Sequence, residues 1–165
     1  MTFRQAAVCA AWSGVVLCSL ILFARPVFAN DPIVGTWKMV SISFYDLETK
    51  QVTQSWGQHP VGMSVYTPEQ RFIFIMTAEG RKGAATEVER AKAWVTMASQ
   101  SGTYRFEGGK YLLTVDISWD PNAVGTVLER DFKIDGDRMT LEVMIRGPAS
   151  GHQIRETIEY QRVTR

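Results

Sequence analysis

The chain contains 165 residues, of which 45% are hydrophobic and 21% charged, and its formal net charge is +1. This length suits one domain with a hydrophobic core rather than two, and the balanced charge without a basic run gives no support to nucleic-acid binding. Both cysteines, Cys9 and Cys18, lie within residues 1–29. The rest of the chain therefore has no disulfide, no thiolate metal ligand and no cysteine nucleophile.

Residues 1–29 have the pattern of an export signal, because a short polar region with one Arg is followed by a long uncharged apolar run. Val27 and Ala29 stand at the −3 and −1 positions of a small-residue cleavage site, which predicts Asn30 as the first mature residue. An uncleaved membrane anchor is the alternative. We expect an exported protein, periplasmic or secreted, whose domain covers 30–165 and is not stably inserted in a membrane after cleavage.

The remaining sequence consists mostly of short β-rich runs separated by turn residues, which predicts an antiparallel β domain. The predicted strands cover residues 33–44, 51–56, 62–67, 72–77, 102–106, 110–118, 126–134, 138–145 and 154–163. Three of the separators, 68–71, 107–109 and 135–137, are typical of hairpin turns.

One predicted helix interrupts the strands, and Thr86 with Glu89 forms the capping box that starts it. Apolar residues then recur at helical spacing, namely Val88, Ala91, Val95 and Ala98, with Trp94 beside them. The preceding run 72–76 is apolar at both strand parities, so it needs cover on both faces. We expect one face of this strand to look into the sheet's interior and the other to lie under the helix.

The number of strands and the short turns between them favour an all-β fold, a closed antiparallel up-and-down barrel of about eight strands with one helix packed outside. Closure is favoured over a two-layered sandwich because it removes exposed sheet edges. A barrel of about eight strands is just wide enough to hold one small ligand.

Four segments resemble the lipocalin-like proteins of the calycin group, in particular the small bacterial lipocalin-like domain. The segments are IVGTWKMVS (33–41), PVGMSVYTPEQR (60–71), DPNAVGT (120–126) and DGDRMTL (135–141). The resemblance implies that Gly35 and Trp37 open the first strand, and that the Trp closes one end of the barrel beneath a basic residue of the last strand. Relatives often carry a His near positions 113–114, where this chain has Leu and Thr, which puts His-dependent chemistry in doubt.

The last predicted strand contains a suitable basic residue. Arg162 shares the strand parity of Ile158 and Tyr160, so alternation places its side chain on the inward, apolar face. An inward guanidinium needs a partner or an aromatic face, and an indole ring is the best such face. Because the first and last strands are neighbours in a closed barrel, we predict that Trp37 and Arg162 meet. The alternative is that both are ordinary strand residues without contact.

Arg130 is the second charged residue predicted to face inward, because it shares a strand parity with Leu128 and Phe132. In one interpretation a neighbouring carboxylate satisfies this Arg without any ligand. In the other, its guanidinium holds the polar end of an otherwise apolar ligand, and a carboxylate suits it well.

The orientation of the run 110–118 depends on its register with the strand that follows. If the two runs pair without a bulge, the polar residues face inward, among them Thr114 and Asp116. A bulge of one residue reverses this orientation and leaves an apolar interior.

The two histidines, His59 and His152, lie on separate loops, so we expect no metal site, which would need three or four ligands. His59 is a candidate gate or general base at the barrel mouth, although a solvated loop His is the simpler interpretation. No hydrolase, phosphate-binding or dinucleotide motif is present, and we expect no cofactor.

Together these patterns predict a protein that binds one small hydrophobic molecule with a polar end. The predicted ligand-binding residues are Arg130, Phe132, Tyr66, Phe74, Tyr104, Thr114 and Asp116, and no catalytic residue is assigned. One alternative is an isomerase or cyclase in which Asp116, Arg130 or Tyr66 moves a proton. Another is a barrel packed solid, with no internal ligand. The sequence indicates no particular oligomeric state.

Overall fold

The computed structural model describes residues 31–164, and the predicted signal segment 1–29 lies outside them. The elements are β1 (Gly35–Asp46), β2 (Val52–Thr53), β3 (Val61–Tyr66), β4 (Arg71–Thr77), α1 (Glu87–Trp94), β5 (Met97–Glu107), β6 (Lys110–Ser118), the 3-10 helix η1 (Pro121–Ala123), β7 (Val127–Asp135), β8 (Arg138–Arg146) and β9 (Gln153–Arg162). Within the described range, no helix is both long and apolar enough to cross a membrane.

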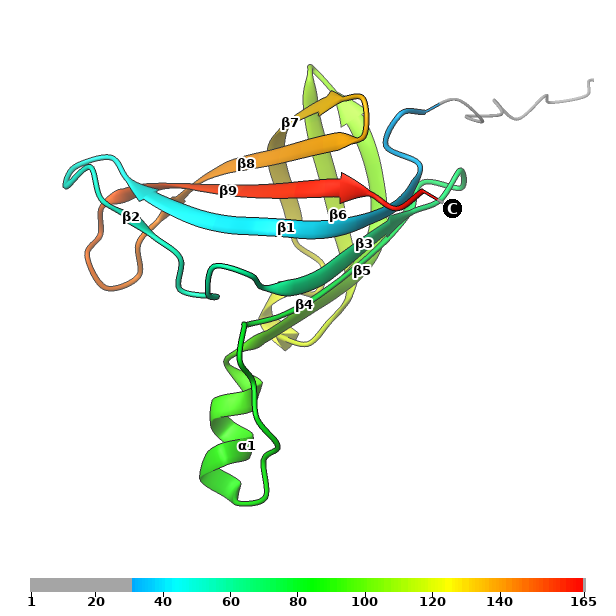
Figure 1. The fold of residues 1–165 in the computed structure, drawn as a ribbon. Coiled ribbons are helices and arrows are strands. Elements are labelled where there is room, and N and C mark those ends of the chain that lie inside the picture. The colour runs from blue at the N-terminus through cyan, green and yellow to red at the C-terminus, as the bar shows by residue number, and fades with distance from the viewer. Residues whose placement is uncertain (1–30, 165) are drawn as a thin grey trace, which may run out of the picture.

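The sheet closes on itself because its first long strand pairs with its last. Neighbouring strands are antiparallel in the order β2-β1-β3-β4-β5-β6-β7-β8-β9, and β1 also pairs with β9. The two-residue β2 is an addition to the end of β1, so the described residues form an eight-stranded barrel (Figure 1). The predicted closed antiparallel barrel is confirmed.

The predicted hairpins are present between β3 and β4, β5 and β6, and β7 and β8. The β5–β6 turn has two consecutive residues with positive φ, Gly108 at 59° and Gly109 at 79°. A two-residue turn of this kind matches the twist of the strands that it joins, and glycine adopts both conformations without strain.

A bulge in β1 keeps the apolar side chains of both halves of this strand inside the barrel. Trp37 and Met39 are buried, and the register with β9 then shifts between Met39 and Ser41. After this shift Ile42 is buried and Phe44 packs against the core. The extra residue therefore moves the inward positions from odd to even numbers.

The helix α1 starts where the sequence predicts. The Thr86 hydroxyl accepts a hydrogen bond from the Glu89 N–H (3.2 Å), and the Glu89 carboxylate accepts one from the Thr86 N–H (2.9 Å). This is the predicted capping box. The helix ends at Trp94, earlier than the apolar spacing indicates, because Ala98 belongs to β5 and pairs with Met76 of β4.

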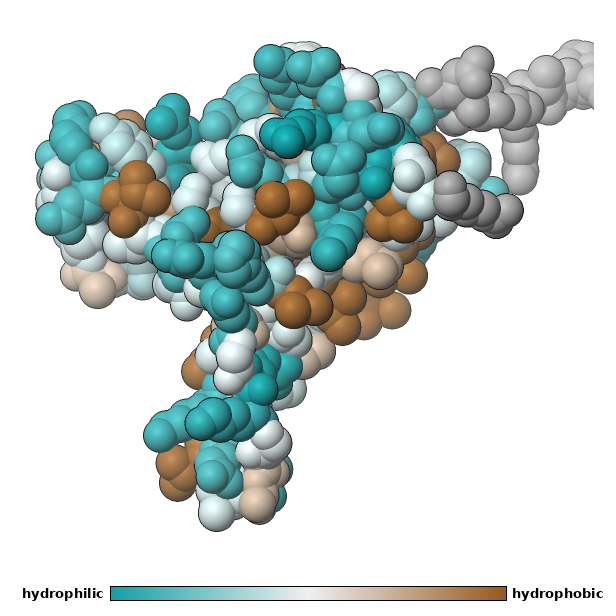
Figure 2. Space-filling view, in the orientation of Figure 1, coloured by the Kyte–Doolittle hydropathy of each residue, from teal (hydrophilic) through white to brown (hydrophobic). Residues whose placement is uncertain are grey.

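The predicted packing of this helix over the outer face of β4 is wrong. α1 projects away from the barrel (Figure 1), and none of its residues is buried. Ile73 and Ile75, which point outward from β4, are 58% and 46% exposed. Val61 and Met63 of β3 are also exposed, and Figure 2 shows apolar side chains over this part of the barrel. The apolar pattern of β4 at both parities therefore reflects an apolar outer surface that no other part of residues 31–164 covers.

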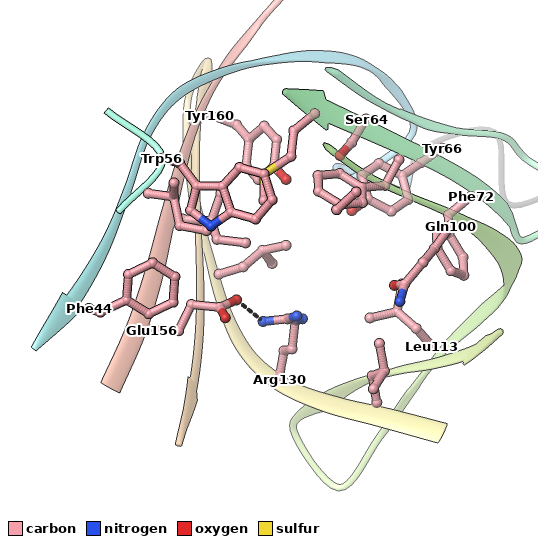
Figure 3. A pocket seen from close by; sticks show the side chains of 17 residues that line it. Phe44, Trp56, Ser64, Tyr66, Phe72, Gln100, Leu113, Arg130, Glu156 and Tyr160 are labelled. Carbon is pink, nitrogen blue, oxygen red and sulfur yellow. Dashed lines mark hydrogen bonds and ion pairs between the residues drawn. The ribbon is translucent and has the colours of Figure 1, made fainter. Parts of the chain in front are cut away.

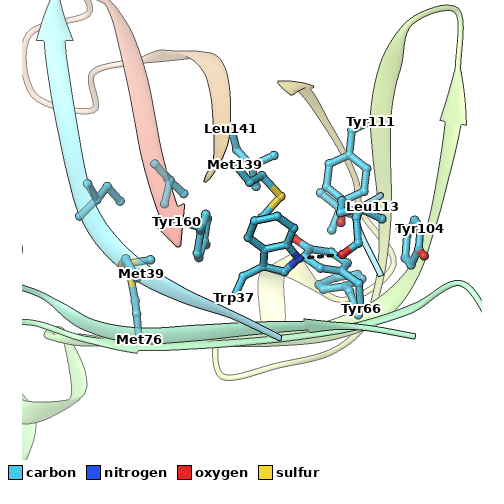
Figure 4. Close-up of a cluster of buried hydrophobic side chains, with 14 of the residues drawn as sticks. Trp37, Met39, Tyr66, Met76, Tyr104, Tyr111, Leu113, Met139, Leu141 and Tyr160 are labelled. Atoms are coloured by element: carbon cyan, nitrogen blue, oxygen red, sulfur yellow. Dashed lines mark hydrogen bonds between the residues drawn. The ribbon is translucent and has the colours of Figure 1, made fainter. Parts of the chain in front are cut away.

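Trp37 lies at the centre of the core at one end of the barrel (Figure 4). It is fully buried, and its indole Nε1 donates a hydrogen bond to the Ile33 carbonyl (2.7 Å). The Cζ atom of Arg162 lies 4.0 Å from the centroid of the Trp37 ring. The same guanidinium donates to the carbonyl of Val34 (2.9 Å) and to that of Pro32. The predicted contact between Trp37 and Arg162 is confirmed.

Gly35 permits the close approach of this guanidinium to the start of β1. A Cβ atom at this position would lie 2.8 Å from Nη1 of Arg162. The φ angle of Gly35 is +135°, a region that residues with a side chain rarely adopt. Any other residue would therefore displace Arg162 or strain the backbone.

A polar contact at the opposite end of β1 joins it to the β8–β9 loop. Nδ1 of His152 lies 2.8 Å from Oδ2 of Asp46, and its Nε2 lies 3.3 Å from Oε2 of Glu48. The hydrogen bond with Asp46 raises the pKa of His152. Hydrogen bonds from the Thr49 backbone N–H and from His152 lower the pKa of Asp46 to about 2. At pH values above about 2 and below the raised pKa of His152, the two groups carry opposite charges.

Replacing Arg162 by Ala is expected to lower the free energy of unfolding by about 2–4 kcal/mol, because it removes the cation–π contact and leaves two backbone carbonyls without donors. Arg155→Ala is the matched control, since Cζ of Arg155 lies 5.2 Å from the centroid of the Tyr45 ring but its side chain is exposed. This control should lose less than about 1 kcal/mol. Urea unfolding measures both values, and equal losses would contradict the structural role of Arg162.

The stability difference between the native chain and His152→Gln is expected to depend on pH. Because the pKa of His152 is raised, its contribution is complete below the ordinary value of 6.5 and is lost as the pH rises through the folded value. Because the pKa of Asp46 is lowered from 3.8, its contribution is present above 3.8 and is lost as the pH falls through about 2. Thermal unfolding should show the largest Tm difference between the native chain and His152→Gln at pH values between 3.8 and 6.5. A difference independent of pH would contradict the ion pair.

Candidate functional site

The interior of the barrel contains a cavity of about 390 Å³. Ile42 and Phe44 line it from β1, whereas Trp37, near the start of the same strand, does not. Along β9, Glu156 lines the cavity and Arg162 does not. The cavity therefore lies toward the β8–β9 loop, away from the Trp37 core. The alternative of a barrel packed solid is wrong.

The wall of this cavity is mostly aliphatic and aromatic, with a small set of polar side chains. The polar lining residues are Ser64, Tyr66, Gln100, Arg130, Glu156 and Tyr160. Its volume lies near the lower end of the range for pockets that hold small organic ligands, roughly 300–1,000 Å³. Apolar walls with a few placed polar groups are typical of such pockets.

Arg130 and Glu156 form an ion pair inside the cavity (Figure 3). Nη1 of Arg130 donates to Oε1 of Glu156 at 2.8 Å, and the two side chains are only 17% and 15% exposed. Arg130 belongs to β7 and Glu156 to β9, so the pair reaches across β8. The structure thus agrees with the interpretation in which a neighbouring carboxylate satisfies Arg130, and this carboxylate belongs to Glu156.

Three residues with hydroxyl groups, Ser64, Tyr66 and Tyr160, line the part of the cavity nearest the core. Burial raises the pKa of both tyrosines, so their phenols stay protonated and uncharged at physiological pH. Ser64 is 1% exposed, and its hydroxyl lies close enough to these phenols to offset part of the rise in their pKa, although no hydrogen bond of its Oγ has normal geometry within residues 31–164. The Oγ atom has almost no accessible surface, so Ser64 offers no open hydrogen-bonding group to a molecule in the cavity.

Three of the predicted ligand-binding residues, Arg130, Tyr66 and Phe74, line the cavity. Phe132 and Tyr104 do not. The Phe132 ring packs against Phe106 with centroids 4.7 Å apart, and the Tyr104 hydroxyl donates to the Thr67 carbonyl (3.1 Å). Both residues point inward as predicted, but they lie in the aromatic core rather than beside the cavity.

Thr114 and Asp116 lie on the outer side of the barrel, so their predicted place in the cavity is wrong. Thr114 pairs with Val127, a register that buries Leu113 on the inner face. Asp116 is exposed and forms an ion pair with Arg71. The apolar orientation of β6 is therefore the one present. The isomerase or cyclase alternative loses the carboxyl group that distinguished it.

Sequence reasoning misses most of the lining residues, among them Trp56, Gln100 and Glu156. Glu156 has the strand parity of Ile158 and Tyr160, so alternation along β9 is sufficient to find it. Gln100 lies in a stretch that the sequence does not predict as strand. Trp56 follows β2 in an irregular segment, where no periodicity indicates the direction of a side chain, and Figure 3 shows its indole over the cavity.

Neither histidine lines the cavity. His59 lies beside a separate hollow on the outer face of β1, β3 and β4, and His152 contacts Asp46 and Glu48. In the part of the chain that the structure describes, no three His, Cys, Asp or Glu residues are grouped to hold a metal ion. His59 therefore has no position from which it acts on a molecule inside the barrel.

A comparison with protein-family models matches residues 34–162 to the lipocalin-like domain. A search of curated proteins found no match. The matched region runs from the start of β1 to the end of β9 and includes every residue that lines the cavity. The order of strands and the Trp37–Arg162 contact agree with what the resemblance implied. The chain belongs to the lipocalin-like domain family.

Proposed function

We propose that this chain is an exported binding protein that holds one small hydrophobic molecule, with a polar group, inside its barrel. The observation that carries the proposal is the cavity of about 390 Å³, whose apolar wall contains a few buried polar groups. The family match supports ligand binding in general. The apolar segment and small-residue site within residues 1–29 support export.

The wall of the cavity accounts for both parts of such a ligand. Phe44, Phe74 and Leu128 belong to its apolar surface, and burying apolar ligand area against them contributes roughly 25 cal/mol per Å². Arg130 and Glu156 provide hydrogen-bonding groups for the polar part. Trp56 adds an aromatic ring over the cavity (Figure 3).

Filling the cavity is expected to abolish binding. Ala98→Phe places a ring in the cavity, because Ala98 lines it, whereas Ser99→Phe adds the same ring on the outer face, where Ser99 pairs with the exposed Ile75. The uncharged probe N-phenylnaphthylamine should bind Ala98→Phe at least about tenfold more weakly than the native chain and Ser99→Phe with little change. Fluorescence titration measures both, with circular dichroism to check folding. Equal binding by the two variants would contradict an internal site.

Export is expected to remove residues 1–29. Expression of the full chain in a bacterial host, followed by fractionation and mass spectrometry, should find a product that begins at Asn30 outside the cytoplasm. Ala29→Leu is the test variant, because a bulky residue at the −1 position blocks cleavage. A native product that retains Met1 and stays in the membrane fraction would support the anchor alternative instead.

A further inference from the structure

The charges inside the cavity are balanced before any ligand enters. Of the residues in the described part of the chain that line the cavity, only Arg130 and Glu156 are charged, and they are paired at 2.8 Å. Both are more than four-fifths buried. The buried tyrosines beside them are neutral, because burial raises the pKa of each phenol. The cavity therefore carries no net formal charge.

A ligand with a carboxylate meets an unfavourable environment in this cavity. To contact Arg130 directly it must displace Glu156, which then remains as a buried carboxylate without its partner, or it must share one guanidinium with Glu156. Breaking a buried ion pair is strongly unfavourable, and two carboxylates close together repel each other. A free fatty acid thus gains little from Arg130.

A neutral polar group meets both a donor and an acceptor that are already in place. The contact with Glu156 uses Nη1 of Arg130 and Oε1 of Glu156, and within residues 31–164 the remaining guanidinium N–H groups and Oε2 make no other side-chain hydrogen bond. An amide or a hydroxyl group, which donates and accepts, satisfies such groups without breaking the ion pair.

We propose that the cavity binds uncharged amphiphiles more tightly than carboxylates of the same size, because the carboxylate of Glu156 already pairs with the guanidinium of Arg130. Uncharged amphiphiles here are apolar molecules with one amide or hydroxyl group. This inference rests on the proposed ligand-binding function and names its ligand class. Glu156 is then a specificity-determining residue, since it keeps the guanidinium from acting as a carboxylate receptor.

The first test compares decanamide, decanol and decanoate at neutral pH, as competitors of N-phenylnaphthylamine on the native chain. Their apolar chains are equal in length, so differences in affinity arise from the polar group. We expect decanamide and decanol to compete at least about tenfold better than decanoate, the ratio that about 1.4 kcal/mol produces. Decanoate competing as well as the two neutral ligands would overturn the proposal.

The second test removes the charge of Glu156 while keeping its size. In Glu156→Gln the guanidinium becomes the one unbalanced charge of the cavity lining, so decanoate should bind at least about tenfold more tightly than to the native chain, and decanamide should change by less than about threefold. Glu159→Gln is the matched control, because Glu159 lies exposed on the same strand, and it should leave both affinities unchanged. The double variant Arg130→Gln with Glu156→Gln should lose the gained decanoate affinity. No gain in Glu156→Gln, or an equal gain in the double variant, would overturn the role of the pair.

The outcomes separate this inference from the function on which it rests. If the probe binds in the cavity and is excluded by Ala98→Phe, but decanoate competes as well as decanamide, the binding function stands and the selectivity is wrong. If no probe binds the native chain, both are wrong. Should Glu156→Gln fail to fold, the ranking of the three ligands on the native chain still decides whether the cavity prefers uncharged amphiphiles.

Discussion

The pairing of β1 with β9 connects the two ends of the domain in one ladder, from Trp37↔Arg162 to Asp46↔Ile154, and it turns a sheet into a closed wall. On such a wall strand alternation assigns each side chain to the inside or the outside. The wall is filled at the end where Trp37 lies and hollow toward the other end. The site therefore depends on a contact between residues that are far apart in the sequence.

The two inward guanidinium groups, those of Arg162 and Arg130, have different surroundings. These surroundings give Arg162 a structural role and place Arg130 beside the candidate site. Arg162 stacks on an indole ring and donates to backbone carbonyls beside it, so its hydrogen-bonding groups face the protein at the filled end. Arg130 has a carboxylate partner and a cavity beside it, so part of its hydrogen-bonding capacity faces the hollow. Paired and hydrogen-bonded charges persist in an apolar interior, whereas isolated ones do not.

Much of this fold is predictable from local patterns. Alternation and turn residues indicate the strands and hairpins, the Thr86–Glu89 box marks the helix start, and strand parity places Arg162 and Arg130 inward. The same parity also places Glu156 inward, so the sequence is sufficient to identify a second inward charge, although not its pairing with Arg130. The packing of the helix was not, because apolar spacing predicts a buried face only where another element lies against it, and α1 projects from the barrel without such an element.

By itself the sequence determined the antiparallel strands, the hairpins, the family resemblance and the chemistry of the side chains available to a site. Only the tertiary structure decided the β6–β7 register, which puts Leu113 inside and Asp116 outside, and the pairing of Arg130 with Glu156. The physical reason is that alternation relates residues within one strand, whereas a loop and a bulge between strands change their relative phase. Whether a hollow remains depends in turn on how all the inward side chains pack together, which no single strand specifies.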